Sequence, residues 1–203
     1  VDIDGAVDMA STLQVDGAIT GSSTINGVGI SYNITNFTSS LLISNDAGTG
    51  TLDDASNNTG LGHEVFDDLT SGDDNTAVGA LALTKLTTGV ENTAFGSQAL
   101  EANTTGGSNT AIGMKAMEAT TTGGNNTAVG VFAMGVNTEG QFNVAVGPNA
   151  LDANTTGDSN VSIGRLSLSA NTTADNNTAV GTSALQVNTT GTNNASLGFS
   201  SLL

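Results

Sequence analysis

The sequence lacks cysteine and tryptophan, has one proline, and contains only three basic residues among 203. Without cysteine, the chain can form neither a disulfide framework nor a thiolate metal site. Nineteen acidic residues give it a net charge of −16. Nucleic acids are bound through clusters of Lys and Arg, and anionic membrane surfaces attract basic segments. We therefore expect the chain to bind neither.

Charged and aromatic residues are also scarce, at 11% and 3% of the chain. An ordinary globular domain carries about 25% charged residues, so Asn, Thr and Ser must solvate this surface. The low aromatic content argues against a thick core and suits a thin core repeated along an axis. The longest apolar run, residues 128–136, contains glycine and is far shorter than the ~20 residues of a membrane span. No membrane insertion is expected.

One pentapeptide, Asn-Thr-Ala-Val-Gly, dominates the sequence and recurs, in this form or a looser one, at every seventeenth position. A fixed repeat period is the signature of a solenoid. Nine copies span residues 58–203, and each is numbered here from its Asn, so that the Gly is at position five. After the first copy, which opens at Asn58, these two positions are Asn75 and Gly79, Asn92 and Gly96, Asn109 and Gly113, Asn126 and Gly130, Asn143 and Gly147, Asn160 and Gly164, Asn177 and Gly181, and Asn194 and Gly198.

The remainder of the unit favours short strands over helix. Positions four and nine are always apolar, whereas glycine, Asn and β-branched residues, which disfavour helix, fill much of the rest. The sequence predicts an all-β fold, a parallel β-solenoid of about nine coils with two short strands in each coil. The Asn-Thr-Thr-Gly segment at positions 12–15 would form the second turn, in which Gly supplies a positive φ. Ala174 replaces that Gly in one copy.

The Asn at position one is expected to have a structural role. In stacked coils, identical Asn side chains form an amide ladder, each bonding to the amides above and below it. We therefore assign these residues to the scaffold and not to a ligand site.

Positions three and four predict an assembly of several chains. Adjacent strand residues face opposite sides, yet both positions are apolar or small. If the larger position-four residues fill the coil, the small row lies outside and needs a second chain, most simply in a parallel homotrimer. The candidates for the trimer axis are Ala77, Ala94, Ala111, Ala128, Ala145, Ser162, Ala179 and Ser196.

The chain divides into three segments on these patterns. Residues 1–30 predict a β-rich shaft of hairpins, because residues 1–7 match residues 13–19 at a spacing of 12 with alternating apolar residues. Residues 31–57 form a neck with a degenerate capping coil around Leu41-Leu42-Ile43. Residues 58–203 form the repeat domain.

The copies at Asn143–Gly147 and Asn160–Gly164 resemble the repeat of the left-handed β-roll in YadA-type heads of trimeric autotransporter adhesins. The repeat of that family is shorter than the unit found here. The longer unit, with Ala-Leu and Asn-Thr-Thr-Gly, is similar to repeats in tail-fibre proteins of marine bacteriophages. This resemblance implies an intertwined homotrimer in a virion tail fibre or at a cell surface, attaching to a host cell-surface glycan or protein. Such fibres often carry a self-cleaving C-terminal chaperone domain, and trimming would suit the end at Leu203.

No catalytic residue, cofactor or metal ligand is expected. His63 is the only histidine, no phosphate-binding loop is present, and the acidic pairs Asp53-Asp54, Asp67-Asp68 and Asp73-Asp74 are weak candidates for calcium. The function expected first is a structural fibre segment for attachment. The alternatives are a bacterial surface adhesin or self-assembling filament, an ice-binding solenoid with an interrupted threonine row, and a polysaccharide-degrading enzyme. The enzyme would need paired carboxylates about 5–9.5 Å apart.

Overall fold

A computed structural model of the chain describes residues 23–25, 28–34, 37–44 and 52–202. These residues contain thirteen strands, joined in one sheet, and no helix. The strands are β1 (Ser23–Ile25), β2 (Val28–Ile34), β3 (Phe37–Ser44), β4 (Ala55–Ser56), β5 (Thr59–Leu61), β6 (Thr76–Val78), β7 (Thr93–Phe95), β8 (Thr110–Ile112), β9 (Thr127–Val129), β10 (Val144–Val146), β11 (Val161–Ile163), β12 (Thr178–Val180) and β13 (Ala195–Leu197).

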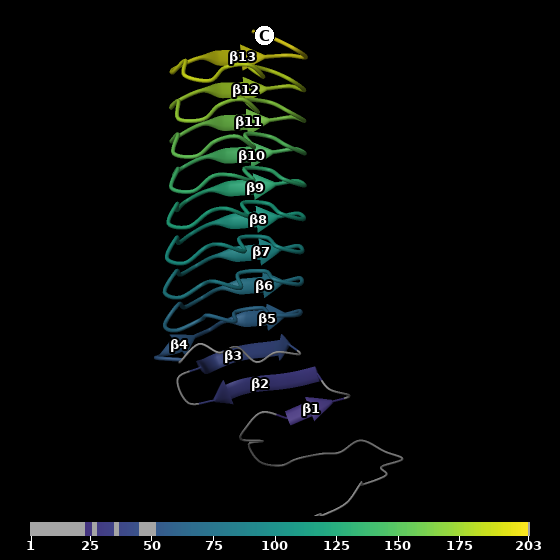
Figure 1. The fold of residues 1–203 in the computed structure, drawn as a ribbon, viewed down its shortest axis with the longest axis vertical. Helices are drawn as coiled ribbons and strands as arrows, with labels where there is room; N and C mark the ends of the chain where they lie inside the picture. The colour runs from purple at the N-terminus through teal and green to yellow at the C-terminus, as the bar shows by residue number, and fades with distance from the viewer. Residues whose placement is uncertain (1–22, 26–27, 35–36, 45–51, 203) are drawn as a thin grey trace, which may run out of the picture.

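Strands β5 to β13 form a parallel β-solenoid of nine coils, as the repeat predicts (Figure 1). Each strand covers positions two to four of one unit and pairs in parallel with the same positions of the next, for example Thr110 with Thr127 and Ile112 with Val129. Because every step of this register equals one repeat unit, equivalent side chains stack in columns along the rod. The strand forms here because β-branched residues are frequent at positions two and four.

The chain enters the solenoid through a short antiparallel meander. β1 pairs with β2 and β2 with β3, and β3 then turns to parallel pairing with β5, with Leu41 opposite Thr59 and Ile43 opposite Leu61. This first step is longer than the repeat unit by a single position. Leu41-Leu42-Ile43 thus occupies positions two to four of a coil below the first regular one. The hairpins expected within residues 1–19 lie outside the described residues.

The row of small residues at position three lies inside the coil, so the expectation that it faces outward toward a trimer axis is wrong. Ala77, Ala94, Ala111, Ala128, Ala145, Ser162 and Ala179 are fully buried and Ser196 is 7% exposed. The position-four residues point outward instead. The physical reason is the size of the interior. Positions eight and nine also point inward, and with a Leu or Met column in place only a small residue fits at position three.

The first coil shows how tight this interior is. Gly60 occupies position three there, and the larger Val65 occupies position eight. A Cβ added to Gly60 would lie 2.9 Å from Val65 Cγ1 and 2.7 Å from Leu42 Cδ1. Position three and position eight therefore share one volume, and a larger residue at one demands a smaller residue at the other.

The second strand predicted for each coil does not form. Positions seven and nine are left-handed in all nine coils, with φ between 47° and 63°. The chain turns twice in this segment, as in the second coil, formed by residues 75–91, where Ala82 N donates to Gly79 O and Leu86 N to Leu83 O. These turns let positions eight and nine both face inward, whereas in a strand one of the two would face outward.

The glycine of the Asn-Thr-Thr-Gly turn is also used differently from the prediction. The left-handed glycines are those at position five, with φ between 124° and 149°. Those at position 15 do not have a positive φ. They allow close stacking, because a Cβ on Gly89 would lie 2.4 Å from Gly106 O in the next coil. Ala174, the one exception, also has no positive φ, so the close approach of the next coil and not the backbone conformation favours glycine at this position.

Candidate functional site

The interior is organised by the Asn ladder expected at position one. In a typical step, the Asn75 backbone N–H and Nδ2 both donate to Asn58 Oδ1, at 3.0 and 3.1 Å. Asn75 Nδ2 also donates across the coil to Gly89 O, at 3.0 Å. These Asn residues are buried along most of the rod. Each amide therefore joins two coils and closes its own coil, which leaves no Asn of this column free for a ligand.

Two further ladders were not anticipated. At position 12, Asn137, Asn154, Asn171 and Asn188 bond in sequence through their side-chain amides, at 2.9 to 3.3 Å. At position 13, each Thr hydroxyl donates to the carbonyl of the Thr one coil above, from Thr70 to Thr189. The invariance of Thr at position 13 was the sequence signal for this column.

One residue interrupts the position-12 ladder. Thr120 stands between Asn103 and Asn137, and its buried Oγ1 has no hydrogen-bond partner. It is the only buried side-chain N or O atom among the described residues in this condition.

The surface best suited to an interaction is the outer side of the parallel sheet, formed by positions two and four and called the strand face here. In all nine coils, positions one to five contain no charged residue. Position four is apolar throughout. Its larger residues are exposed, with Phe95 at 57% and Ile112 at 41%, and its four valines are partly exposed. Monomeric soluble proteins seldom expose a continuous apolar stripe of this length. A chain of net charge −16 thus presents one long uncharged face with an apolar column along it.

Threonine lines the same face at position two. Thr76, Thr93, Thr110, Thr127 and Thr178 point outward beside the apolar column, and the row is broken by Val144, Val161 and Ala195. The row therefore alternates with an aliphatic column on a regular parallel sheet, although it is not continuous.

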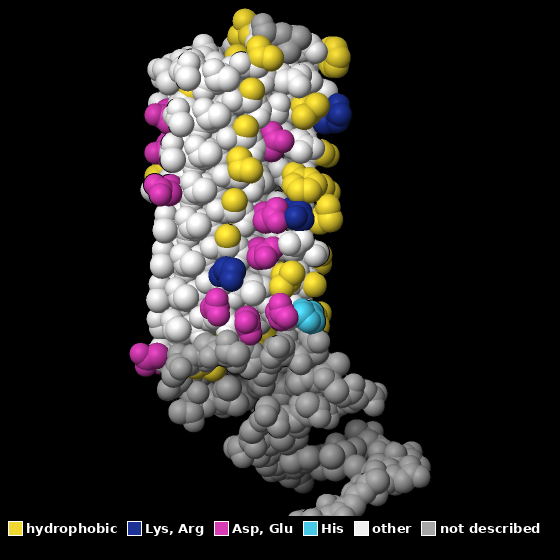
Figure 2. Space-filling model, viewed as in Figure 1, with side chains coloured by type: hydrophobic (Ala, Val, Ile, Leu, Met, Phe, Trp, Pro, Cys, Tyr) yellow, Lys and Arg dark blue, Asp and Glu magenta, His cyan; other side chains and the backbone are white. Residues whose placement is uncertain are grey.

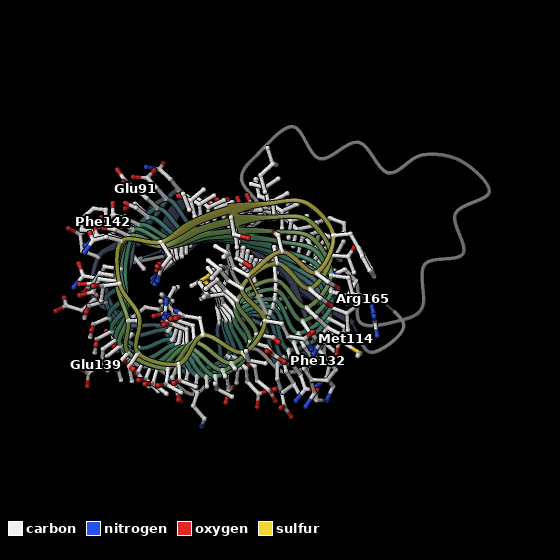
Figure 3. The ribbon with its side chains drawn as sticks, turned by 90° about the horizontal axis from the view of Figure 1, so that it is seen from above. Glu91, Met114, Phe132, Glu139, Phe142 and Arg165 are labelled. Atoms are coloured by element: carbon white, nitrogen blue, oxygen red, sulfur yellow. The ribbon has the colours of Figure 1, made fainter. Side chains whose placement is uncertain are left out.

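Two edges flank the strand face and differ in character. The first edge, formed by positions six and seven, carries Met114, Phe132 and Arg165, and the second edge, formed by positions 16 and 17, carries Glu91 and Phe142. Figure 3 shows these two groups on opposite sides of the coil, with Glu139 farther round from the second edge. In Figure 2, hydrophobic side chains gather along one side of the rod, and acidic ones lie both beside them and along the opposite side.

Charged groups are sparse and partly paired. Lys115 Nζ lies 2.8 Å from Glu118 Oε1 and 5.8 Å from the centroid of the Phe132 ring, so its charge is already neutralised. Neither Lys85 nor Arg165 forms an ion pair within the described part of the chain. Burial raises the pKa of Asp152 above its ordinary value, and the hydrogen bond from Asn149 opposes that shift.

The acidic pairs and His63 form no cluster in the residues described. No group of three or more His, Cys, Asp or Glu side chains close enough to hold a metal occurs there. Asp73 Oδ1 instead accepts a hydrogen bond from Ser56 N at 2.7 Å. His63 is about half exposed, with Nε2 3.5 Å from Glu64 Oε1. The described residues also contain no helix that could span a membrane.

No protein-family model, curated protein or solved structure matches this chain. The geometry of the rod and its surface is therefore the basis for the functional conclusion.

Proposed function

We propose that this chain is a structural segment of a homotrimeric fibre, carried by a virion or exposed at a cell surface, that mediates attachment to a cell. The strand face is the observation that carries this proposal. It combines an apolar column along the whole solenoid with the absence of charge at positions one to five. Burying such a face against another copy would remove its apolar surface from water, at about 25 cal/mol per Å².

Each strand is apolar or small on both of its sides, which favours a second chain. The surface that this second chain would cover is the position-four column and not the position-three row expected from the sequence. The small side fills the interior of its own coil. The outward column at position four is the side left to be covered. Three parallel rods with their strand faces turned to a common axis cover it on every copy. The proposal includes a left-handed winding of the coils, as in the adhesin heads that the repeat resembles.

A fibre segment also agrees with the way the rod is built. Each coil bonds only to its neighbours through the Asn and Thr ladders, so length can be added in uniform units without changing the cross-section. The cell-surface partner, a host glycan or protein, would contact variable positions outside the strand face. A bacterial adhesin or a self-assembling extracellular filament would use the same trimeric rod.

The test replaces one residue on the strand face and one elsewhere with the same charge. Ile112→Asp places a carboxylate on the strand face, and Val136→Asp is the matched control because Val136 is similarly exposed, at 46%, but occupies position 11. Light scattering should give the wild type and the Val136→Asp variant the mass of three chains, and shift Ile112→Asp toward monomer. A monomeric wild type, or equal masses for both variants, would contradict the proposal.

Ice binding is a second candidate, favoured by the outward threonine row. Position-two Thr side chains repeat at strand spacing, about 4.8 Å, beside an aliphatic column on the same face. A strand face buried in a trimer could not contact ice, so the two candidates exclude each other. Thermal hysteresis in a monomeric wild type would favour ice binding, and its absence would remove that candidate.

A further inference from the structure

We propose that, in the homotrimer, the first edge of each rod packs against the second edge of the next rod, and that Arg165 pairs there with Asp158 and Asp175 of the neighbouring copy. This inference rests on the proposed trimer and adds to it the residues that join the copies. The edges are those shown on opposite sides of the coil in Figure 3.

Cyclic symmetry restricts which residues can meet. Rotation about an axis parallel to the rods involves no shift along the axis, so only residues at the same level come together. In this solenoid the level rises by one coil for each repeat unit. A residue on the first edge therefore faces second-edge residues of its own coil or of the coil below. A cyclic contact is also heterologous, because it joins two different edges.

The apolar residues of the two edges match under this rule. On the first edge, Val131 and Phe132 are 41% and 36% exposed, and they lie within a coil of Phe142, which is 58% exposed on the second edge. Leu81 lies at the level of Val90, which is exposed on the second edge. Met114 faces a stretch where position 16 is glycine, at Gly107 and Gly124. Met114, which has no apolar partner on the second edge, thus faces the smallest residues there.

The charges match in the same way. Arg165 is the one basic residue on either edge that has no ion pair within the described chain, since Lys115 is held by Glu118. Its level lies between Asp158 and Asp175 on the second edge. Both carboxylates are fixed by their own rod, because Gln141 N donates to Asp158 Oδ1 and Asp158 N donates to Asp175 Oδ1. A guanidinium from the next rod would then meet two oriented carboxylates, which suits its donor geometry.

The distribution of charge between the two edges favours this pairing at Arg165. The whole chain has only three basic residues, and two of them, Lys115 and Arg165, lie on the first edge. The first edge carries one acidic residue, Glu64, which lies 3.5 Å from His63, whereas the second edge carries five, Asp73, Asp74, Glu91, Asp158 and Asp175. Complementary charge at an interface fixes register and selects the correct partner face. Here it would hold three rods in parallel and at the same level.

Charge reversal tests the ion pairs. The variants are Arg165→Glu, the pair Asp158→Lys with Asp175→Lys, and all three together. Lys85→Glu is the matched control, because Lys85 is exposed at position 11, away from both edges. Circular dichroism verifies that each variant keeps the coil. Light scattering over a dilution series then gives the concentration at which the trimer dissociates.

Arg165→Glu should raise the concentration at which the trimer dissociates about tenfold or more, and Lys85→Glu should leave it unchanged. The triple variant should bring this concentration most of the way back to the wild-type value. If Arg165→Glu behaves like Lys85→Glu while the wild type is trimeric, the edge pairing is wrong and the fibre proposal stands. A monomeric wild type would overturn both.

Cross-linking gives a second readout that does not depend on stability. Because the chain has no cysteine, Phe132→Cys with Phe142→Cys introduces one thiol on each edge. A short thiol-specific cross-linker should then produce covalent dimers and trimers in denaturing gels. The control, Phe132→Cys with Val136→Cys, has no thiol on the second edge and should remain largely uncross-linked. Equal cross-linking of the two variants would contradict the edge-to-edge contact.

Discussion

At the scale of single residues, the interior is governed by the pair at positions three and eight. The two residues share one volume inside the coil, and after the first coil both are Ala or both are Ser. In the coil that opens at Asn160, Ser162 Oγ donates to Ser167 O at 2.7 Å and also bonds Ser167 Oγ. The same arrangement recurs at Ser196 and Ser201. A buried hydroxyl needs a partner, so the two serines occur together.

The serine pair allows a direct measurement of this coupling. Ser162→Ala or Ser167→Ala alone leaves one buried hydroxyl with fewer partners and should cost about 1 kcal/mol of unfolding free energy. The double variant recreates the Ala pair of the other coils and should lie close to wild type. Urea unfolding of the four proteins gives the coupling energy. Additive losses in the double variant would show that the two sites are independent.

The break in the position-12 ladder offers a stabilising substitution. Thr120→Asn would place an amide between those of Asn103 and Asn137 and remove the unpartnered hydroxyl. We expect a gain of about 1 kcal/mol in unfolding free energy. Thr122→Asn, two positions away on the exposed surface, is the control and should change little. A loss of stability in Thr120→Asn would mean that the coil cannot accept the larger side chain there.

At the scale of one coil, the fold depends on left-handed backbone at non-glycine residues. Positions seven and nine adopt it in every coil, at a cost of roughly 1–2 kcal/mol for each residue. The hydrogen bonds to the next coil and the burial of position nine offset that cost. No sequence pattern indicated these turns, because Leu and Met are not residues that favour positive φ. From sequence alone, the apolar pair at positions eight and nine therefore predicts a strand.

The two kinds of glycine in a coil should respond differently to alanine. Gly130 is at position five, with φ of 140°, and an added Cβ would lie 2.7 Å from Gly147 O. Gly135 lies in the same coil, has no positive φ, and an added Cβ there would lie 3.4 Å from Phe132 O, an ordinary contact. We expect Gly130→Ala to cost roughly 1–3 kcal/mol and Gly135→Ala to cost clearly less, measured by thermal unfolding. Equal losses would contradict the separate roles assigned here.

Period, strand position and the inner Asn column were all predictable, because each depends on one residue type recurring once in every repeat unit. Whether the position-three side chain points into or out of the coil was not predictable from the sequence. A strand with Ala at one position and a larger apolar residue at the next is consistent with either face inward, as the segments Ala77-Val78 and Ala94-Phe95 illustrate. Only the volume taken by the position-nine column decides between them. The sequence pattern does not indicate the two edges of the strand face, because they occupy variable positions of the repeat unit.

At the scale of the whole molecule, the rod separates its structural and variable surfaces. Interior columns are nearly invariant, the strand face is uniformly uncharged, and charge within the repeat domain is confined to positions 6–17 of the unit. Net charge of one sign keeps such a rod soluble, whereas a charge-free face permits contact between copies. The result is one elongated body (Figure 1), with a single long face that carries no charge.

The stacking of coils has a mechanical consequence. The bonds between coils, such as Thr76 N to Asn92 O and Thr93 N to Asn109 O, join one coil to the next. Tension applied to the two ends of one chain would load these bonds one coil at a time. Each coil that detaches should release one repeat unit, about 55–60 Å of extended chain. In optical-tweezer traces, the extension of the chain should therefore increase in a series of equal steps. A single large increase in extension would contradict coil-by-coil release. Such a tether would lengthen under load and keep its remaining coils intact.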